Sequence, residues 1–248
     1  MTSATPVLFV HGIRTSATMW RRQLTILGEA GHPALAVDLP GHGSRLAERF
    51  TVEGALAAID DGVAALGGPV VLVGLSLGGY YAIEYAARHP ERVAALVAAG
   101  CCAIPSGWPL DAYRRLARLI RRLPDHGLWL HTTLVRVLLP RQGAADTLAG
   151  GVPLHVMDAG LAATGTLRPL KGLSRYPGPV WLVNGAFDQF RLHERRFLGA
   201  CRNGRLVVVP RASHLVSLAQ PERFATVLRG ILDDVAAGRP RPIVDPVE

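Results

Sequence analysis

The chain has 248 residues, 49% of which are apolar, and its formal net charge at pH 7 is +8. This length and apolar content suffice for one sizeable hydrophobic core, and no run of about 18 uncharged apolar residues indicates a membrane span. The positive charge does not indicate nucleic-acid binding, because every basic residue except Lys171 is an arginine, the arginines are scattered, and no zinc-finger, helix-turn-helix or basic-aromatic pattern is present.

Six short aliphatic runs predict strands, at 7–10, 34–38, 70–73, 93–99, 180–184 and 205–209. Helix-like stretches lie between most of them, at 19–30, 51–66, 77–88, 193–201 and 221–237. Such alternation predicts an α/β fold whose central sheet is mainly parallel and is flanked by helices. Ligands bind such sheets beyond the carboxyl ends of the strands, so polar residues at those ends are the site candidates.

One long segment interrupts this alternation. Residues 104–175 contain no convincing strand, only helix-like pieces such as 111–123 and 128–139. An insertion between two strands is expected to form a helical cap over the site. The core would then comprise 1–103 and 176–237. The Pro-rich, charged tail at 238–248 is predicted to be disordered.

A serine stands where the third strand must end. The stretch VVLVGLSLGGYY at 70–81 predicts a buried strand, a turn at Ser76 and a helix. Gly74-Leu75-Ser76-Leu77-Gly78 fits the G-x-S-x-G nucleophile elbow, in which the serine has a positive φ and the small residues let strand and helix approach. Asp188 follows the fifth strand and His214 follows the sixth, in the chain order that this motif requires.

With these residues the chain resembles the α/β-hydrolase family, from His11-Gly12 to the last helix, and in particular its branch with a helical cap. Its sheet would begin at the third strand of the family's full set. The resemblance implies a nucleophile, Ser76, a general base, His214, and an acid, Asp188, that orients the base. The competing interpretation of Asp188 is a helix cap before His193.

The resemblance also implies an oxyanion hole. Its two backbone N–H donors would be Leu77, at the start of a helix, and Ile13, after His11-Gly12. His11 itself is expected to be structural. Trp20 either lines the substrate pocket or packs under the loop, and Trp129 is a pocket candidate within an apolar run. The remaining histidines away from the motif are expected to be surface or packing residues: His89, His126, His131, His155 and His193.

The constellation favours hydrolysis of a carboxylic ester, thioester or lactone of a small apolar substrate through an acyl-enzyme. Cofactor-free lyases, perhydrolases and C–C bond hydrolases use the same three residues, so they stay open, as does a binding protein with a vestigial triad. Epoxide hydrolases and haloalkane dehalogenases place Asp at the elbow, which disfavours those reactions. We expect no cofactor and no metal.

The insertion is strongly basic, with nine arginines and Lys171 against four aspartates. The amphipathic stretch at 113–123 is either a solvated helix face or a docking surface for an acyl carrier protein or a coenzyme A thioester. The first residues lack a secretory signal, and three cysteines without metal-ligand spacing favour reduced thiols, so a cytoplasmic location is expected. The oligomeric state stays open.

Overall fold

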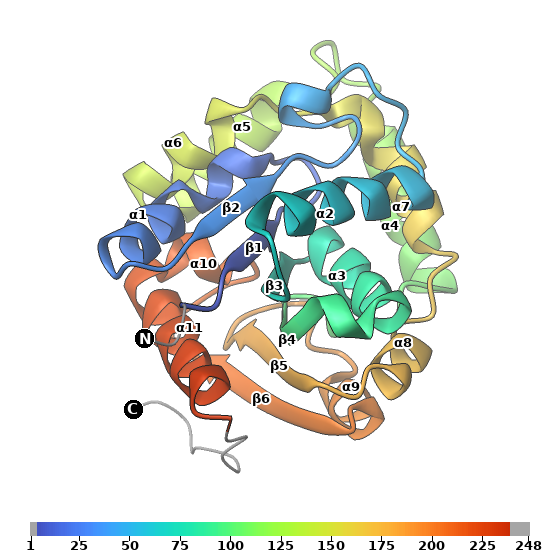
Figure 1. Cartoon of the computed structure of the whole chain (residues 1–248). Coiled ribbons are helices and arrows are strands. Elements are labelled where there is room, and N and C mark those ends of the chain that lie inside the picture. Colours follow the sequence, from blue (N-terminus) through green and yellow to red (C-terminus); the bar gives the residue numbers. More distant parts are fainter. Residues whose placement is uncertain (1–3, 239–248) are drawn as a thin grey trace.

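A computed structural model describes residues 4–238, which contain one six-stranded sheet. Its order is β2-β1-β3-β4-β5-β6, and every neighbouring pair is parallel (Figure 1). All six strands predicted from the sequence are present, with ends that differ by at most two residues. They are β1 (Val7–Val10), β2 (Ala34–Val37), β3 (Val70–Leu75), β4 (Val93–Ala99), β5 (Pro179–Gly185) and β6 (Asn203–Val209).

Helices cover both faces of the sheet (Figure 1). One face carries α1 (Arg21–Glu29), α10 (Val216–Ala219) and α11 (Pro221–Ala236). The other carries α2 (Val52–Leu66), α3 (Leu77–Arg88), α8 (Pro169–Arg175) and α9 (Glu194–Ala200). The described residues also contain four short 3-10 helices: η1 (Ala17–Trp20), η2 (Gly43–Arg45), η3 (Pro90–Arg92) and η4 (Leu154–Val156).

The alternation of side chains along each strand divides the core in two. In β1, Leu8 and Val10 point toward the α2/α3 layer, whereas Val7 and Phe9 point toward the α1/α11 layer. Both sets are fully buried, which explains why the central strands read as continuous aliphatic runs rather than as alternating patterns.

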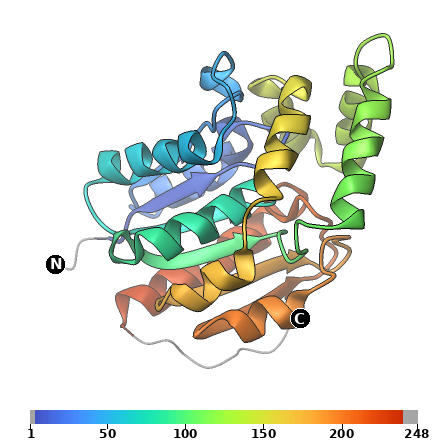
Figure 2. The same cartoon turned by 90° about the vertical axis from the view of Figure 1, so that its right-hand side faces the viewer.

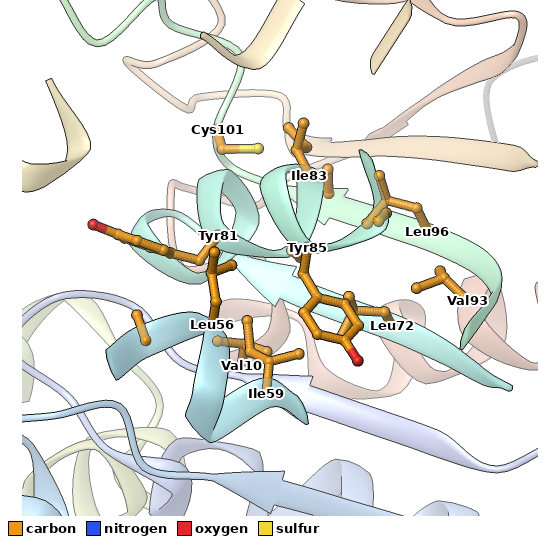
Figure 3. Packing of buried hydrophobic residues seen from close by; sticks show 14 of the residues in the cluster. Val10, Leu56, Ile59, Leu72, Tyr81, Ile83, Tyr85, Val93, Leu96 and Cys101 are labelled. Atoms are coloured by element: carbon orange, nitrogen blue, oxygen red, sulfur yellow. The ribbon is translucent and has the colours of Figure 1, made fainter. Parts of the chain in front are cut away.

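Helix α3 is packed firmly against the sheet. Figure 3 shows Tyr85 of α3 beside Leu72 of β3, with Ile59 of α2 nearby. The Tyr85 hydroxyl donates a 2.6 Å hydrogen bond to Asp60 of α2. This packing fixes the start of α3, where the predicted elbow lies.

Four helices of residues 104–175 lie on one side of the molecule (Figure 1): α4 (Trp108–Ile120), α5 (Leu128–Leu138), α6 (Arg141–Ala149) and α7 (Met157–Thr164). In Figure 2, α4 stands beside α7 beyond the strands, and Ala117 of α4 packs on Met157 and Leu161 of α7. The last helix, α8, instead packs against α3 and α9.

Three remaining predictions concern the chain as a whole. Cys101, Cys102 and Cys201 are all free thiols, the first two of them buried. Among residues 4–238, no helix combines the length and the apolar character needed to cross a membrane. The tail predicted to be disordered, 238–248, lies outside the described residues except for Gly238.

Candidate active site

Ser76 forms a one-residue turn between β3 and α3. Its φ and ψ are 55° and −114°, a left-handed backbone that costs energy for any residue other than glycine. The Ser76 N–H donates to the carbonyl of Ala99 at 2.8 Å, and the Ser76 carbonyl accepts from the N–H of Gly79 at 3.0 Å. These two hydrogen bonds hold the strained backbone in place.

The glycines of the elbow are required by close backbone contacts. A Cβ atom on Gly78 would lie 2.4 Å from the carbonyl oxygen of Val10, and one on Gly74 would lie 2.3 Å from the carbonyl oxygen of Gly78. Both distances are far below van der Waals contact with atoms that cannot rotate away. The G-x-S-x-G spacing therefore follows from how closely α3 approaches β1 and β3.

Gly78→Ala is expected to lower the free energy of unfolding by about 3 kcal/mol, because the new methyl group forces α3 away from β1. Gly230→Ala is the matched control, since Gly230 lies inside α11 with open space around it. That substitution should raise stability by about 0.5–1 kcal/mol. Urea unfolding of the two variants measures both changes, and equal stabilities would contradict the packing described here.

Three side chains from three strand ends form a hydrogen-bonded chain, the Ser76–His214–Asp188 cluster. His214 Nε2 lies 3.0 Å from Ser76 Oγ, and His214 Nδ1 lies 3.1 Å from Asp188 Oδ1. Ser76 follows β3, Asp188 follows β5 and His214 follows β6. Residues separated by up to 138 positions thus meet at the carboxyl edge of the sheet.

The Asp188 carboxylate is fully buried. Its Oδ1 atom also accepts a 2.8 Å hydrogen bond from the N–H of Phe190, while Oδ2 is buried and has no hydrogen-bond partner in the described part of the chain. The helix-cap interpretation of Asp188 is wrong. The next helix, α9, begins at Glu194, and its N-cap position is His193, five residues beyond Asp188; no side chain among residues 4–238 caps it.

The imidazole of His214 is enclosed by neighbours on two sides. The ring of Phe190 lies 4.7 Å from it, centroid to centroid. Gly100, at the end of β4, has φ 59°, and a Cβ atom there would lie 3.2 Å from the imidazole. These contacts restrict the histidine to the orientation in which both of its nitrogens have partners.

The two predicted oxyanion donors lie beside Ser76. Leu77 is the first residue of α3, so its N–H has no partner within the helix. Ile13 and Leu77 both line the cavity that contains Ser76. Gly12 brings the β1–η1 loop close, since a Cβ atom on it would be 3.6 Å from Ser76 Cβ.

His11 holds that loop in place. Its Nε2 atom accepts a 3.0 Å hydrogen bond from the N–H of Leu39, so Nδ1 carries the proton and donates to the carbonyl of Gly12 at 2.8 Å. Burial, and secondarily the nearby His42, lower the pKa of His11 to about 3. His11 is therefore neutral and fully buried, in keeping with the structural role predicted for it.

A cavity of about 290 Å³ opens above the cluster. Ser76 and His214 form part of its lining, together with residues of the insertion such as Leu110, Val135 and Leu161. The volume suits a small organic molecule. No group of three or more metal-binding side chains occurs within residues 4–238.

The two tryptophans predicted for the pocket do not line it. Trp20 is fully buried, stacks on Phe9 at 4.7 Å and contacts Phe224, so the packing alternative is the correct one. Trp129 is 71% exposed. The prediction for Trp129 is wrong. His131 and Val135, one turn apart on α5, face the cavity, and a residue two positions before His131 lies on the opposite side of the helix.

Comparison with known proteins gives a consistent result. The family model described as the alpha/beta hydrolase family matches residues 7–227. A pimeloyl-[acyl-carrier protein] methyl ester esterase of Neisseria meningitidis is 32% identical over 92% of this chain and 94% of its own length. An esterase of Mycobacterium tuberculosis is 30% identical over 93% of this chain and 84% of its own length. A thermophilic esterase from Thermogutta terrifontis superposes with a TM-score of 0.74, at 26% identity over 94% of this chain and 91% of that one.

The chain belongs to the alpha/beta hydrolase family. It is an enzyme of that family, and its six parallel strands are the central sheet of the alpha/beta hydrolase fold.

Sequence reasoning missed several residues around the cavity of this hydrolase. His131 and His193 were expected at the surface or in packing, yet both line the cavity, and His193 Nδ1 accepts a 3.2 Å hydrogen bond from the N–H of Ile104. Arg14, directly after Ile13, also lines it. For His131 the spacing of four residues to Val135 is a usable signal; for His193 no local pattern distinguishes it.

Proposed function

We propose that this hydrolase cleaves the carboxylic ester of a small substrate through an acyl-enzyme intermediate. The observation that carries the proposal is the Ser76–His214–Asp188 cluster, hydrogen-bonded throughout and located in a small, largely apolar cavity. The esterases among its relatives support the same reaction.

In the acylation step Ser76 Oγ attacks the ester carbonyl carbon while its proton passes to His214 Nε2. The resulting imidazolium then gives that proton to the alcohol oxygen, the C–O bond breaks, and the acyl group stays on Ser76. In deacylation His214 takes a proton from water, the water oxygen attacks the acyl carbon, and the proton returns to Ser76 as the acid leaves.

The Asp188 carboxylate has two tasks in this sequence. It accepts the proton on His214 Nδ1 in a hydrogen bond, which directs the free lone pair of Nε2 at Ser76. It also stabilises the imidazolium formed during the attack. The N–H of Phe190 donates to the same carboxylate and holds it in position.

The negative charge on the carbonyl oxygen would be stabilised by the backbone N–H groups of Leu77 and Ile13. Leu77 contributes an N–H at the positive end of α3. Because these donors are fixed by the elbow and by the loop that His11 secures, they need little reorganisation when the charge develops.

The helices of residues 104–175 would act as the cap. Their residues Leu110, Val135 and Leu161 supply apolar wall on the side of the cavity away from the sheet. A cap of this kind limits the access of water and selects the size of the acyl group.

A panel of small esters, thioesters and lactones tests the proposal, with product release followed for each compound. Ester cleavage by the pure protein is expected, with kcat/KM highest for short acyl chains that fit a cavity of about 290 Å³. If the protein hydrolyses no ester but catalyses addition to a carbonyl group or cleavage of a C–C bond, the proposal is contradicted and a lyase is favoured.

The basic surface of α4 bears on whether the substrate is carried by a protein or by coenzyme A. Arg114 pairs with Asp158 of α7 at 3.2 Å. Arg115, Arg118 and Arg121 are exposed and form no ion pair within residues 4–238. The Neisseria relative is named for an acyl-carrier substrate, but the small cavity favours a carrier-free ester here.

Replacing these three arginines with Glu is therefore expected to change kcat/KM by less than about threefold. This holds both for a small methyl ester and for the thioester of the same acyl group with an acyl carrier protein. Charges at the rim of a docking surface act mainly on the encounter rate. A decrease in kcat/KM of tenfold or more that is confined to the carrier-protein thioester, and is abolished by high salt, would instead identify α4 as a carrier-docking surface.

A further inference from the structure

Among residues 4–238, Arg14 is the only one with a permanent charge in the cavity lining. The described residues that line the cavity include no Asp or Glu and no other Arg or Lys. Arg14 directly follows Ile13, so its side chain starts on the residue next to a proposed oxyanion donor. A lone cation in a small, mostly apolar cavity gives that cavity a positive potential.

Within residues 4–238, the Arg14 guanidinium has no hydrogen-bond or ion-pair partner. Its Nε atom is buried without a hydrogen bond, and no carboxylate among residues 4–238 lies within 4.0 Å of the guanidinium. Leaving such a donor buried and unpaired costs free energy, which a bound anion would recover.

The backbone of Arg14 is also unusual. Its φ is 62°, in the left-handed region that glycine and asparagine enter at lower cost. Arginine in this position therefore has a higher conformational energy than glycine would have. This strain lies next to the proposed reaction centre, where strained residues commonly serve the site.

His131 of α5 is the second unpaired group of this wall. Its Nε2 atom is buried and forms no hydrogen bond with any of residues 4–238. Burial, followed by the charge of Arg14, lowers the pKa of His131 to about 4, so the imidazole is neutral at pH 7. In the tautomer with its proton on Nε2, the histidine can donate a hydrogen bond to an anion without repelling Arg14.

Other polar side chains of the lining already have acceptors. The Tyr80 hydroxyl donates to the carbonyl of Ala103 at 2.6 Å. The hydroxyls of Thr147 and Thr164 donate to the carbonyls of Gly143 and Gly160, each at 2.7 Å. Unsatisfied buried donors are thus concentrated at Arg14 and His131 rather than spread over the wall.

We propose that Arg14 and His131 form a subsite for a carboxylate of the substrate, so that the preferred substrates are half-esters of dicarboxylic acids. The free carboxylate would bind at Arg14, the apolar chain would lie along the cavity wall, and the esterified carboxyl group would reach Ser76. A guanidinium binds a carboxylate with two parallel N–H donors, which fixes the orientation as well as the charge of the ligand. The ester part of this proposal rests on the proposed function.

Monomethyl esters of C4 to C8 dicarboxylic acids, each compared with the methyl ester of the monocarboxylic acid of equal length, test the subsite kinetically. The protein should favour the half-ester at its best length by roughly tenfold or more in kcat/KM. Arg14→Met should reduce that preference by roughly 10- to 100-fold, and His131→Phe should reduce it less. Arg136→Met is the matched control, because Arg136 is exposed on α5 outside the cavity and should leave the preference unchanged.

Calorimetric binding to the Ser76→Ala protein separates the subsite from the chemistry. Monomethyl adipate should bind at least about tenfold more tightly than methyl hexanoate, and adding Arg14→Met should remove the difference. Tight, Arg14-dependent binding without ester turnover by the unmodified protein would uphold the subsite and refute the proposed function. Ester turnover with equal affinities, and with no preference for the half-ester, would overturn the subsite alone. If Arg14→Met does not fold, equal affinities of Ser76→Ala for the two ligands are still sufficient to reject the carboxylate subsite.

Discussion

Ser76→Ala is expected to lower kcat for ester hydrolysis by roughly 10³- to 10⁶-fold with the fold intact. Without Oγ no acyl-enzyme can form, and the remaining rate comes from binding and from the backbone N–H donors alone. Within residues 4–238 the Ser76 side chain makes no hydrogen bond other than that to His214, so its removal leaves the backbone hydrogen bonds of the elbow unchanged. Initial rates with the best ester of the panel measure the loss.

The control for this variant is Ser106→Ala, a substitution of an exposed serine in the loop after β4. It should retain activity within about threefold, as is usual for surface positions. A folded Ser76→Ala protein that hydrolyses the ester at a near-normal rate would remove Ser76 from the mechanism.

Asp188→Asn is expected to reduce kcat by about 10⁴-fold. The amide is similar in size to the carboxylate, but it carries no charge to stabilise the imidazolium. When its NH₂ faces His214, it also favours the tautomer with the proton on Nε2, which cannot accept the Ser76 proton. Because Oδ1 also accepts from the N–H of Phe190, the loop around residue 190 should shift as well.

Asp158→Asn serves as the comparison, since Asp158 pairs with Arg114 on the insertion and does not line the cavity. Its effect on kcat should be below about threefold, in keeping with the small contribution of exposed ion pairs. A similarly small effect from Asp188→Asn would assign the orienting role to another acid and leave Asp188 with a structural role in its turn.

The elements that the sequence predicted well are those whose local pattern is dictated by packing. The strand at 70–75 is buried on both faces, so it reads as an uninterrupted aliphatic run. The elbow was recognisable because Gly74 and Gly78 face backbone atoms at distances that no side chain tolerates. The order of Asp188 and His214 followed from the strands before them, so long-range proximity could be inferred from topology.

The insertion was harder to predict, because its helices use only part of their apolar surface. The sequence places Leu116, Leu119, Ile120 and Leu123 on one face of a helix, a pattern typical of a core-facing side. The three leucines are nevertheless exposed, and Ile120 is half-buried. The side that packs on α7 uses Leu110, Tyr113 and Ala117 instead. Periodicity shows that a helix is amphipathic, but it does not show which neighbour covers the apolar face.

The same limitation explains the pocket residues. Trp129 was selected for its size and apolar surroundings, whereas His131, two residues later, was set aside for lack of a partner in the sequence. The rotation of α5 about its axis decides between them, and that rotation depends on contacts with distant parts of the chain. The spacing of four residues from His131 to Val135 indicates a shared helix face, but no local pattern indicates that Arg14, 117 positions earlier, lies near His131.

The proposed mechanism depends on Ser76 as a nucleophile activated by His214. Its most direct test is covalent labelling of the protein with a fluorophosphonate, followed by peptide mass spectrometry. We expect a single phosphonate adduct on the peptide that contains Ser76, with labelling lost in Ser76→Ala and slowed at least about a hundredfold in His214→Gln. Labelling of a different residue, or of Ser76 at the same rate without His214, would show that Ser76 is not a nucleophile activated by His214.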